Sequence, residues 1–111
     1  MQLNTRFNEN IIIIDITGEV DLYNSPNIKD MIIDKMNSGY KKIVLNLNDV
    51  SYIDSSGIGT LIYCRTTLNQ ANGQLKIINI KDSVKRIFEL TRLVNYFNVF
   101  DSEEAAIKSF I

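Results

Sequence analysis

The chain has 111 residues, of which 45% are hydrophobic, enough for one domain with a packed core but not for two. Its 12 lysines and arginines nearly balance 13 aspartates and glutamates, and a net charge of −1 argues against a protein that binds the nucleic-acid backbone. The absence of histidine removes the usual general base and the commonest zinc ligand, and the single cysteine, Cys64, excludes an intrachain disulfide.

The first third of the chain predicts a β-hairpin and then a helix. Residues 3–7 form a short edge strand, residues 8–10 a turn, and residues 11–17 a β-branched strand that Gly18 ends. The unbroken isoleucine run at 11–14 indicates burial on both faces of the sheet. After it, a helix begins with a polar cap and Pro26, and has one apolar face. The cap is Asn24 or Ser25, and the face consists of Ile28, Met31, Ile32 and Met36.

The middle of the chain predicts two further core strands around a second helix. Residues 43–47 form a buried strand, Asn48 and Asp49 a turn, and residues 50–53 lead to Asp54. A helix is expected over residues 57–71. It is followed by a core strand whose expected bounds are 75–80.

The last third predicts a helix, a short strand and a final helix. The first helix opens at Ser83, residues 96–100 form the strand, and Asp101 or Ser102 caps the last helix. The inward face of the first helix is expected to comprise Val84, Ile87, Phe88 and Leu90. Strands that alternate with helices after an opening hairpin indicate one α/β domain over residues 1–111. Its sheet should be mixed and mostly parallel, with four to five strands, an antiparallel edge strand and about four helices.

The run Asp54-Ser55-Ser56-Gly57-Ile58-Gly59 is the most informative motif, because it lies where a buried strand meets a helix. Free N–H groups and the helix dipole favour an anion at such a position. A serine there can receive a phosphate, whose oxygens are expected to accept from N–H groups near Gly57 and Ile58. The simpler interpretation is a helix cap formed by Asp54 or a serine.

Two chemical alternatives fit the same motif less well. A nucleophilic serine of the hydrolase type needs glycines two positions before and after it, and Tyr52 or Ile53 occupies the earlier position. An aspartate that accepts a phosphate, as in response-regulator receivers, needs acidic residues after the first strand and a later lysine. Glu19, Asp21 and Lys81 supply part of that pattern, but the opening hairpin does not fit it.

Several ordered blocks of this sequence resemble the anti-sigma factor antagonists of the STAS-domain family, from about residue 3 to about residue 110. The Asp-Ser-Ser-Gly block in its strand-to-helix setting is the most specific of them. The blocks are Gly18-Glu19-Val20-Asp21, residues 43–47, residues 52–59 and residues 84–93.

The resemblance implies a switch in which other proteins carry out the chemistry. The unphosphorylated form would bind an anti-sigma factor that is a Ser/Thr kinase and so release the sigma factor. The kinase would phosphorylate the serine directly after the aspartate, Ser55, and a metal-dependent phosphatase would reverse this. ATP and metal belong to those partners, so we expect no catalytic residue, cofactor or metal site in this chain.

The residues expected to contact the partner are Asp21, Asp54, Ser56, Gly57 and Ile58. Asp21 and Asp54 would lie near Ser55 and keep the surface acidic, Ser56 would be a supporting cap, and Ile58 is either core or an exposed apolar contact. Other side chains are assigned packing roles. Tyr23 and Tyr52 should pack near the site, Cys64 should be buried, and the core should include Leu90, Leu93, Val94, Tyr96 and Phe97.

Two other functions remain open at this stage. The chain could be a phosphorylatable STAS adaptor in a partner-switching pathway that does not end in sigma release, or an enzyme or small-ligand binder. No segment is apolar over a length that spans a bilayer or resembles a signal peptide, and a single cysteine suits a reducing compartment. We therefore expect a cytoplasmic protein that contacts neither membrane nor nucleic acid directly.

Overall fold

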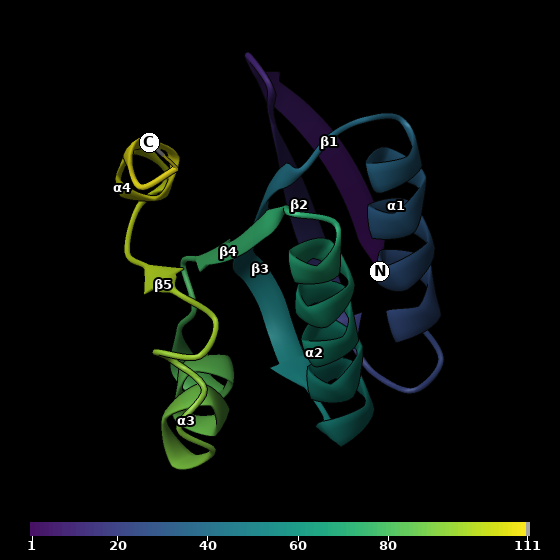
Figure 1. Cartoon of the computed structure of the whole chain (residues 1–111). Helices are drawn as coiled ribbons and strands as arrows, with labels where there is room; N and C mark the ends of the chain where they lie inside the picture. Colours follow the sequence, from purple (N-terminus) through teal and green to yellow (C-terminus); the bar gives the residue numbers. More distant parts are fainter. Residues whose placement is uncertain (111) are drawn as a thin grey trace.

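The computed structural model describes residues 1–110 and begins with the predicted hairpin (Figure 1). Strand β1 (Gln2–Asn8) pairs antiparallel with β2 (Ile11–Val20) around a two-residue loop, in which Glu9 has the left-handed φ of 55° typical of tight hairpins. The prediction that Gly18 ends the second strand is wrong. Gly18 takes a φ of 110° beside an irregularity in the ladder, and the strand continues to Val20.

The other strands run parallel to β2, so that β1 is the predicted antiparallel edge strand. They are β3 (Lys42–Ile53), β4 (Gln74–Ile78) and β5 (Val99–Phe100), and the order across the sheet is β1-β2-β3-β4-β5. Response-regulator receivers have the order 2-1-3-4-5, so this sequential order excludes the receiver alternative.

Strand β3 is longer than the sequence suggests. The turn predicted at Asn48 and Asp49 is wrong, because the chain stays extended there and pairs with the continuation of β2 past its irregularity. The register joins Thr17 to Asp49 and Val20 to Ile53. Because of this added length, the carboxyl end of β3 lies beside the carboxyl end of β2.

Helices cover both faces of the sheet (Figure 1). On one face, α1 (Ser25–Asn37) and α2 (Ser55–Gln70) pack on the strands, and α3 (Asp82–Leu90) adds Val84 and Phe88 to the same core. On the other face lies α4 (Glu103–Lys108), whose start is capped by the hydroxyl of Ser102 accepting from the N–H of Ala105 at 3.1 Å. None of the described helices combines the length and apolar character needed to cross a membrane.

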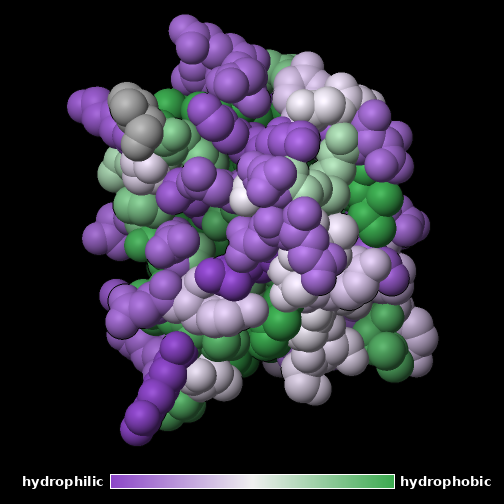
Figure 2. Space-filling view, in the orientation of Figure 1, coloured by the Kyte–Doolittle hydropathy of each residue, from purple (hydrophilic) through white to green (hydrophobic). Residues whose placement is uncertain are grey.

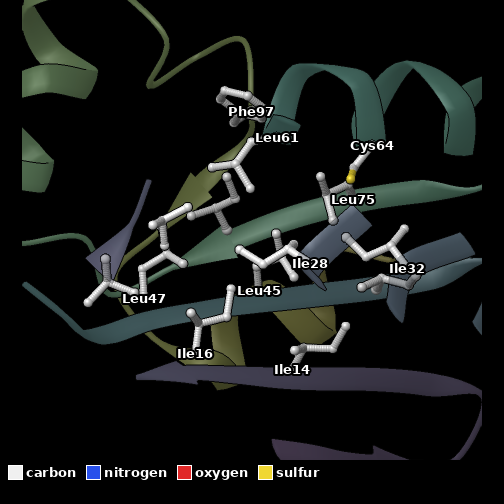
Figure 3. Close-up of a cluster of buried hydrophobic side chains, with 14 of the residues drawn as sticks. Ile14, Ile16, Ile28, Ile32, Leu45, Leu47, Leu61, Cys64, Leu75 and Phe97 are labelled. Atoms are coloured by element: carbon white, nitrogen blue, oxygen red, sulfur yellow. The ribbon is translucent and has the colours of Figure 1, made fainter. Parts of the chain in front are cut away.

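The main core lies between the sheet and helices α1 and α2 (Figure 3). Burying one such aliphatic side chain stabilises the fold by about 1.5–3 kcal/mol. Cys64 is buried in this layer, as predicted, and burial raises the pKa of its thiol to about 12. The labelled side chains in Figure 3 include Ile14, Ile16, Ile28, Ile32, Leu45, Leu47, Leu61 and Leu75.

The second face is apolar only where α4 covers it, over Ile11, Ile13, Val44 and Ile78. Beyond the helix, polar side chains follow in the same rows of the sheet. Figure 2, in the orientation of Figure 1, shows hydrophilic residues interspersed with apolar ones over the surface of the molecule.

An ion-pair network spans the sheet beside α4. The Arg6 guanidinium donates to both carboxylate oxygens of Asp15, at 2.6 and 2.8 Å, and to Glu103 of α4, at 2.7 and 3.2 Å. The Asn46 amide donates to Asp15 at 2.8 Å. Arg6 thus holds the pKa of Asp15 below its usual value and ties the edge strand to α4.

Two predicted packing residues lie in solvent instead. Leu90 is 76% exposed, because α3 ends there and Arg92, at φ 59°, reverses the chain so that Leu93 contacts the core in its place. Tyr23 is 85% exposed in the loop between β2 and α1. The prediction that Leu90 packs in the core is therefore wrong, and a Tyr23 side chain this exposed does not pack near the site in the way predicted.

Candidate functional site: a serine at the start of helix α2

Ser55 is the first residue of α2, and its side chain is exposed. The helix begins directly after β3, at the carboxyl ends of the parallel strands, where β2 also ends. The N–H of Asp54 donates to the carbonyl of Val20 at 3.2 Å, which binds the two strand ends together. Asp21 follows Val20, so Asp21 and Asp54 lie at the carboxyl ends of neighbouring strands, as predicted.

Asp54 is the N-cap of α2, and Ser56 is not. Asp54 has extended backbone, and its Oδ1 accepts from the N–H of Gly57 at 2.8 Å. Its carbonyl accepts from the N–H of Ile58 at 3.0 Å. The prediction that Ser56 is the supporting cap is therefore wrong, because Ser56 lies inside the first turn of the helix and Asp54 supplies the capping oxygen.

This cap also decides which N–H groups a phosphate could reach. The groups of Gly57 and Ile58 are already hydrogen-bonded to Asp54, so the expectation that they are open to a phosphate is wrong. Within residues 1–110, the N–H groups of Ser55 and Ser56 have no acceptor. The open donors therefore lie at Ser55 itself and the next residue.

Asp21 organises the loop that enters α1. Its Oδ1 accepts from the N–H groups of Tyr23 at 3.0 Å and Asn24 at 2.9 Å, and its carbonyl accepts from the N–H of Ser25 at 2.9 Å. Asn24 is the N-cap of α1 but makes no capping bond with its side chain, which donates to the carbonyl of Glu19 at 3.2 Å. One oxygen of Asp21 is thus bound within the turn, while no described group donates to Oδ2.

Gly57 allows the start of α2 to lie against the end of β2. A Cβ built on Gly57 would come within 2.5 Å of the Val20 carbonyl oxygen and 2.7 Å of a side-chain carbon of Ile53. A Cβ on Gly59 would meet nothing within 4 Å. Of the two glycines in the motif, only Gly57 is required by packing.

A mostly apolar hollow of about 430 Å³ adjoins Ser55, between the start of α2 and helix α3. Ile58 is half-buried: it packs against the core and also lines this hollow, so it has both of its expected environments. Tyr52, 44% exposed, lines it as well, near the site as predicted. Ile87 of α3 and Thr91, the C-cap residue of that helix, complete the wall, and their spacing of four residues places them on one side of the helix. Sequence reasoning missed these two as site residues.

No group of three His, Cys, Asp or Glu side chains within the described residues is arranged to hold a metal ion. The site instead offers a hydroxyl, two partly used carboxylates, open N–H groups and an apolar wall. Such groups can offer hydrogen bonds, charge pairing and apolar contact to a binding partner.

A model of the STAS domain matches residues 2–106 of the chain. The chain belongs to the STAS-domain family. This STAS protein is 29% identical over 104 residues to the anti-sigma-B factor antagonist of Staphylococcus aureus, covering 94% of this chain and 96% of that protein. It is 27% identical over 108 residues to the anti-sigma-B factor antagonist of Bacillus subtilis, covering 97% and 98% respectively.

The fold is also that of the Bacillus cell fate determinant SpoIIAA, an anti-sigma factor antagonist. The phosphorylated form of SpoIIAA aligns with a TM-score of 0.76 and 22% identity, over 99% of this STAS protein and 100% of SpoIIAA. Its unphosphorylated form aligns with a TM-score of 0.74. At this identity the likeness establishes the architecture alone.

Proposed function

We propose that this STAS protein is an anti-sigma factor antagonist whose binding to its partner is controlled by phosphorylation of Ser55. In its unphosphorylated form it binds an anti-sigma factor that is a Ser/Thr kinase, and the sigma factor is released. The observation that carries the proposal is an exposed serine at the first position of α2, beside Asp54 and an apolar hollow. The names of both curated relatives support the antagonist role.

The surface around Ser55 suits a protein partner more than a small substrate. Tyr52, Ile58 and Ile87 offer apolar contact, and Oδ2 of Asp21 and of Asp54 can pair with basic groups. Apolar contact at the centre with charges at the rim is the usual composition of a transient interface. The partner then supplies ATP and the metal, and a separate phosphatase removes the phosphate.

A phosphate on Ser55 would change this surface strongly. It adds about −1.5 to −2 charges to a helix start that already carries Asp54, with Asp21 on the neighbouring strand end. Oxygens of the phosphate can accept from the open N–H groups of Ser55 and Ser56, so the modified helix start itself remains stable. A partner whose apolar surface packs over the hollow beside Ser55 would then have to bury the added charge, and this desolvation cost weakens binding.

Ser55→Ala and Ser55→Asp test the switch, with Ser56→Ala as the matched control. Candidate anti-sigma kinases of the source organism are mixed with each protein in calorimetric titrations. We expect Ser55→Ala to bind like the parent and Ser55→Asp to bind about 10- to 100-fold more weakly, which corresponds to about 1.4–2.8 kcal/mol. Equal binding and regulation of all four proteins would refute the proposal.

Mass spectrometry after incubation with the kinase and ATP locates the phosphate. We expect one phosphate on Ser55 in the parent and in Ser56→Ala, and none in Ser55→Ala. A phosphate found only on Ser56 would move the assignment by one residue. Recovery of the kinase from cells without any sigma factor in its complexes would instead favour the adaptor function.

A further inference from the structure

We propose that strand β1 is a dimerisation edge, through which two copies of this chain join their sheets by antiparallel pairing of β1 with β1. The two edges of the sheet differ in a way that leads to this proposal (Figure 1). The β5 edge is only two residues long, and such shortness is one way in which proteins prevent edge pairing. β1 has seven residues and regular pairing with β2 from Gln2 to Asn8, without a bulge.

None of the usual protections is present along β1. It contains no proline and no lysine, and its one charged residue, Arg6, is ion-paired with Asp15 and Glu103. This network carries a net charge of −1, so two copies brought close together repel each other weakly and salt screens the repulsion. Phe7 places an apolar ring at this edge with 56% of its surface in solvent, and this ring packs against Tyr40 with the ring centroids 5.6 Å apart.

The hairpin geometry shows which backbone groups are open. In a hairpin with a two-residue loop, the residues flanking the loop exchange both backbone hydrogen bonds, and here these are Asn8 and Ile11. The alternation along β1 then directs the N–H and C=O groups of Leu3, Thr5 and Phe7 away from β2. These three residues form the open edge.

The open edge is complementary to itself. A two-fold axis at Thr5 places Thr5 opposite Thr5 of the second copy, and Leu3 opposite Phe7 of the second copy. Each of these pairs can exchange both N–H···O bonds, and the Leu3–Phe7 pairs cover the exposed rings. Two strands of this length bury less than the roughly 1,200 Å² of a standard stable interface, so the dimer is weak and forms as concentration rises.

Pairing at β1 leaves the serine surface accessible, because Ser55 follows the central strand β3 rather than an edge strand. The proposal is therefore independent of the switch, and Ser55→Asp is expected to dimerise like the parent. Failure of the phosphorylation proposal would not alter this expectation.

Thr5→Pro is the test, because it removes an outward N–H from the edge while the bonds between β1 and β2 remain. Thr5→Val, which keeps the N–H, is the control, and thermal unfolding checks that both variants fold. In sedimentation velocity from low micromolar to millimolar concentration, we expect the parent and Thr5→Val to shift to a dimer and Thr5→Pro to stay monomeric. Phe7→Lys places a charge opposite Leu3 of the second copy, so this variant should also stay monomeric.

Amide hydrogen exchange identifies the surface that pairs. At high concentration, exchange at Leu3, Thr5 and Phe7 should slow in the parent, while Asn4 and Arg6 are protected at every concentration. A parent that stays monomeric throughout, or a dimer that persists in Thr5→Pro, would overturn the proposal. A dimer with unchanged exchange at the three edge amides would show pairing by another face and would also overturn it.

Discussion

Gly57→Ala should destabilise the protein although alanine is the better helix former. The new methyl group would stand 2.5 Å from the carbonyl oxygen of Val20 and 2.9 Å from one of its side-chain carbons, and 2.7 Å from a side-chain carbon of Ile53. The carbonyl oxygen is backbone in a sheet and has no rotamer by which to move away. Relief therefore requires that the start of α2 move as a unit away from the end of β2.

The size of the effect follows from two opposing contributions. Overpacking a tight contact costs about 1–3 kcal/mol, and a clash with backbone belongs at the upper end of that range. Alanine in place of glycine in a helix increases the free energy of unfolding by about 1 kcal/mol. The net loss is about 2 kcal/mol in the free energy of unfolding, or a fall of roughly 8 °C in Tm for a domain of this size.

Gly59→Ala is the matched control, because it makes the same chemical change two residues further along the same helix. Its Cβ would meet nothing within 4 Å, so only the helix preference remains, and we expect a gain of about 1 kcal/mol. Urea denaturation of the parent and both variants measures the difference. Equal effects of the two substitutions, or a Gly57→Ala protein as stable as the parent, would refute the argument that the backbone contact at Val20 sets the position of α2.

Three further substitutions or treatments test the cap, the ion-pair network and the buried thiol. Asp54→Ala should lose about 1 kcal/mol with the cap of α2, while Asp54→Asn keeps the acceptor and most of the stability; equal losses in urea denaturation would contradict the capping role. Arg6 lowers the pKa of Asp15, so that pair stabilises the fold above the ordinary Asp15 pKa of 3.8, and the contribution is lost as pH falls through the lower folded value. Arg6→Gln should therefore be less stable than the parent at pH 7 by an amount that shrinks below pH 3.8, and a difference independent of pH would count against it. Because burial raises the Cys64 pKa to about 12, iodoacetamide at pH 8 should label the thiol only after denaturation, and equal labelling of the folded protein would disprove its burial.

Much of the architecture could be predicted because it depends on short-range patterns. The isoleucine run at 11–14 predicted a strand buried on both faces, and the structure confirms it with exposures of at most 6%. The alternation of strand and helix patterns predicted the mixed sheet, its antiparallel edge and the number of helices. The strand-to-helix junction at Asp54 was also predicted from local residues.

The details of the site were less predictable because three side chains compete to cap the helix there. Asp54, Ser55 and Ser56 all carry oxygens of the right type. The choice falls on Asp54 because its N–H bonds to the Val20 carbonyl, and that bond holds its backbone extended. A distant strand end thus selects the cap.

The sequence by itself determined the class of fold, the buried strands and the place where a polar strand-to-helix junction would lie, because hydrophobic period and turn chemistry act between near neighbours. Only the tertiary structure decided that β3 continues through Asn48 and Asp49, that Gly57 must lack a side chain while Gly59 need not, and that α3 supplies one wall beside Ser55. These features depend on contacts between segments far apart in the chain. Such contacts exist only once the sheet has brought those segments together.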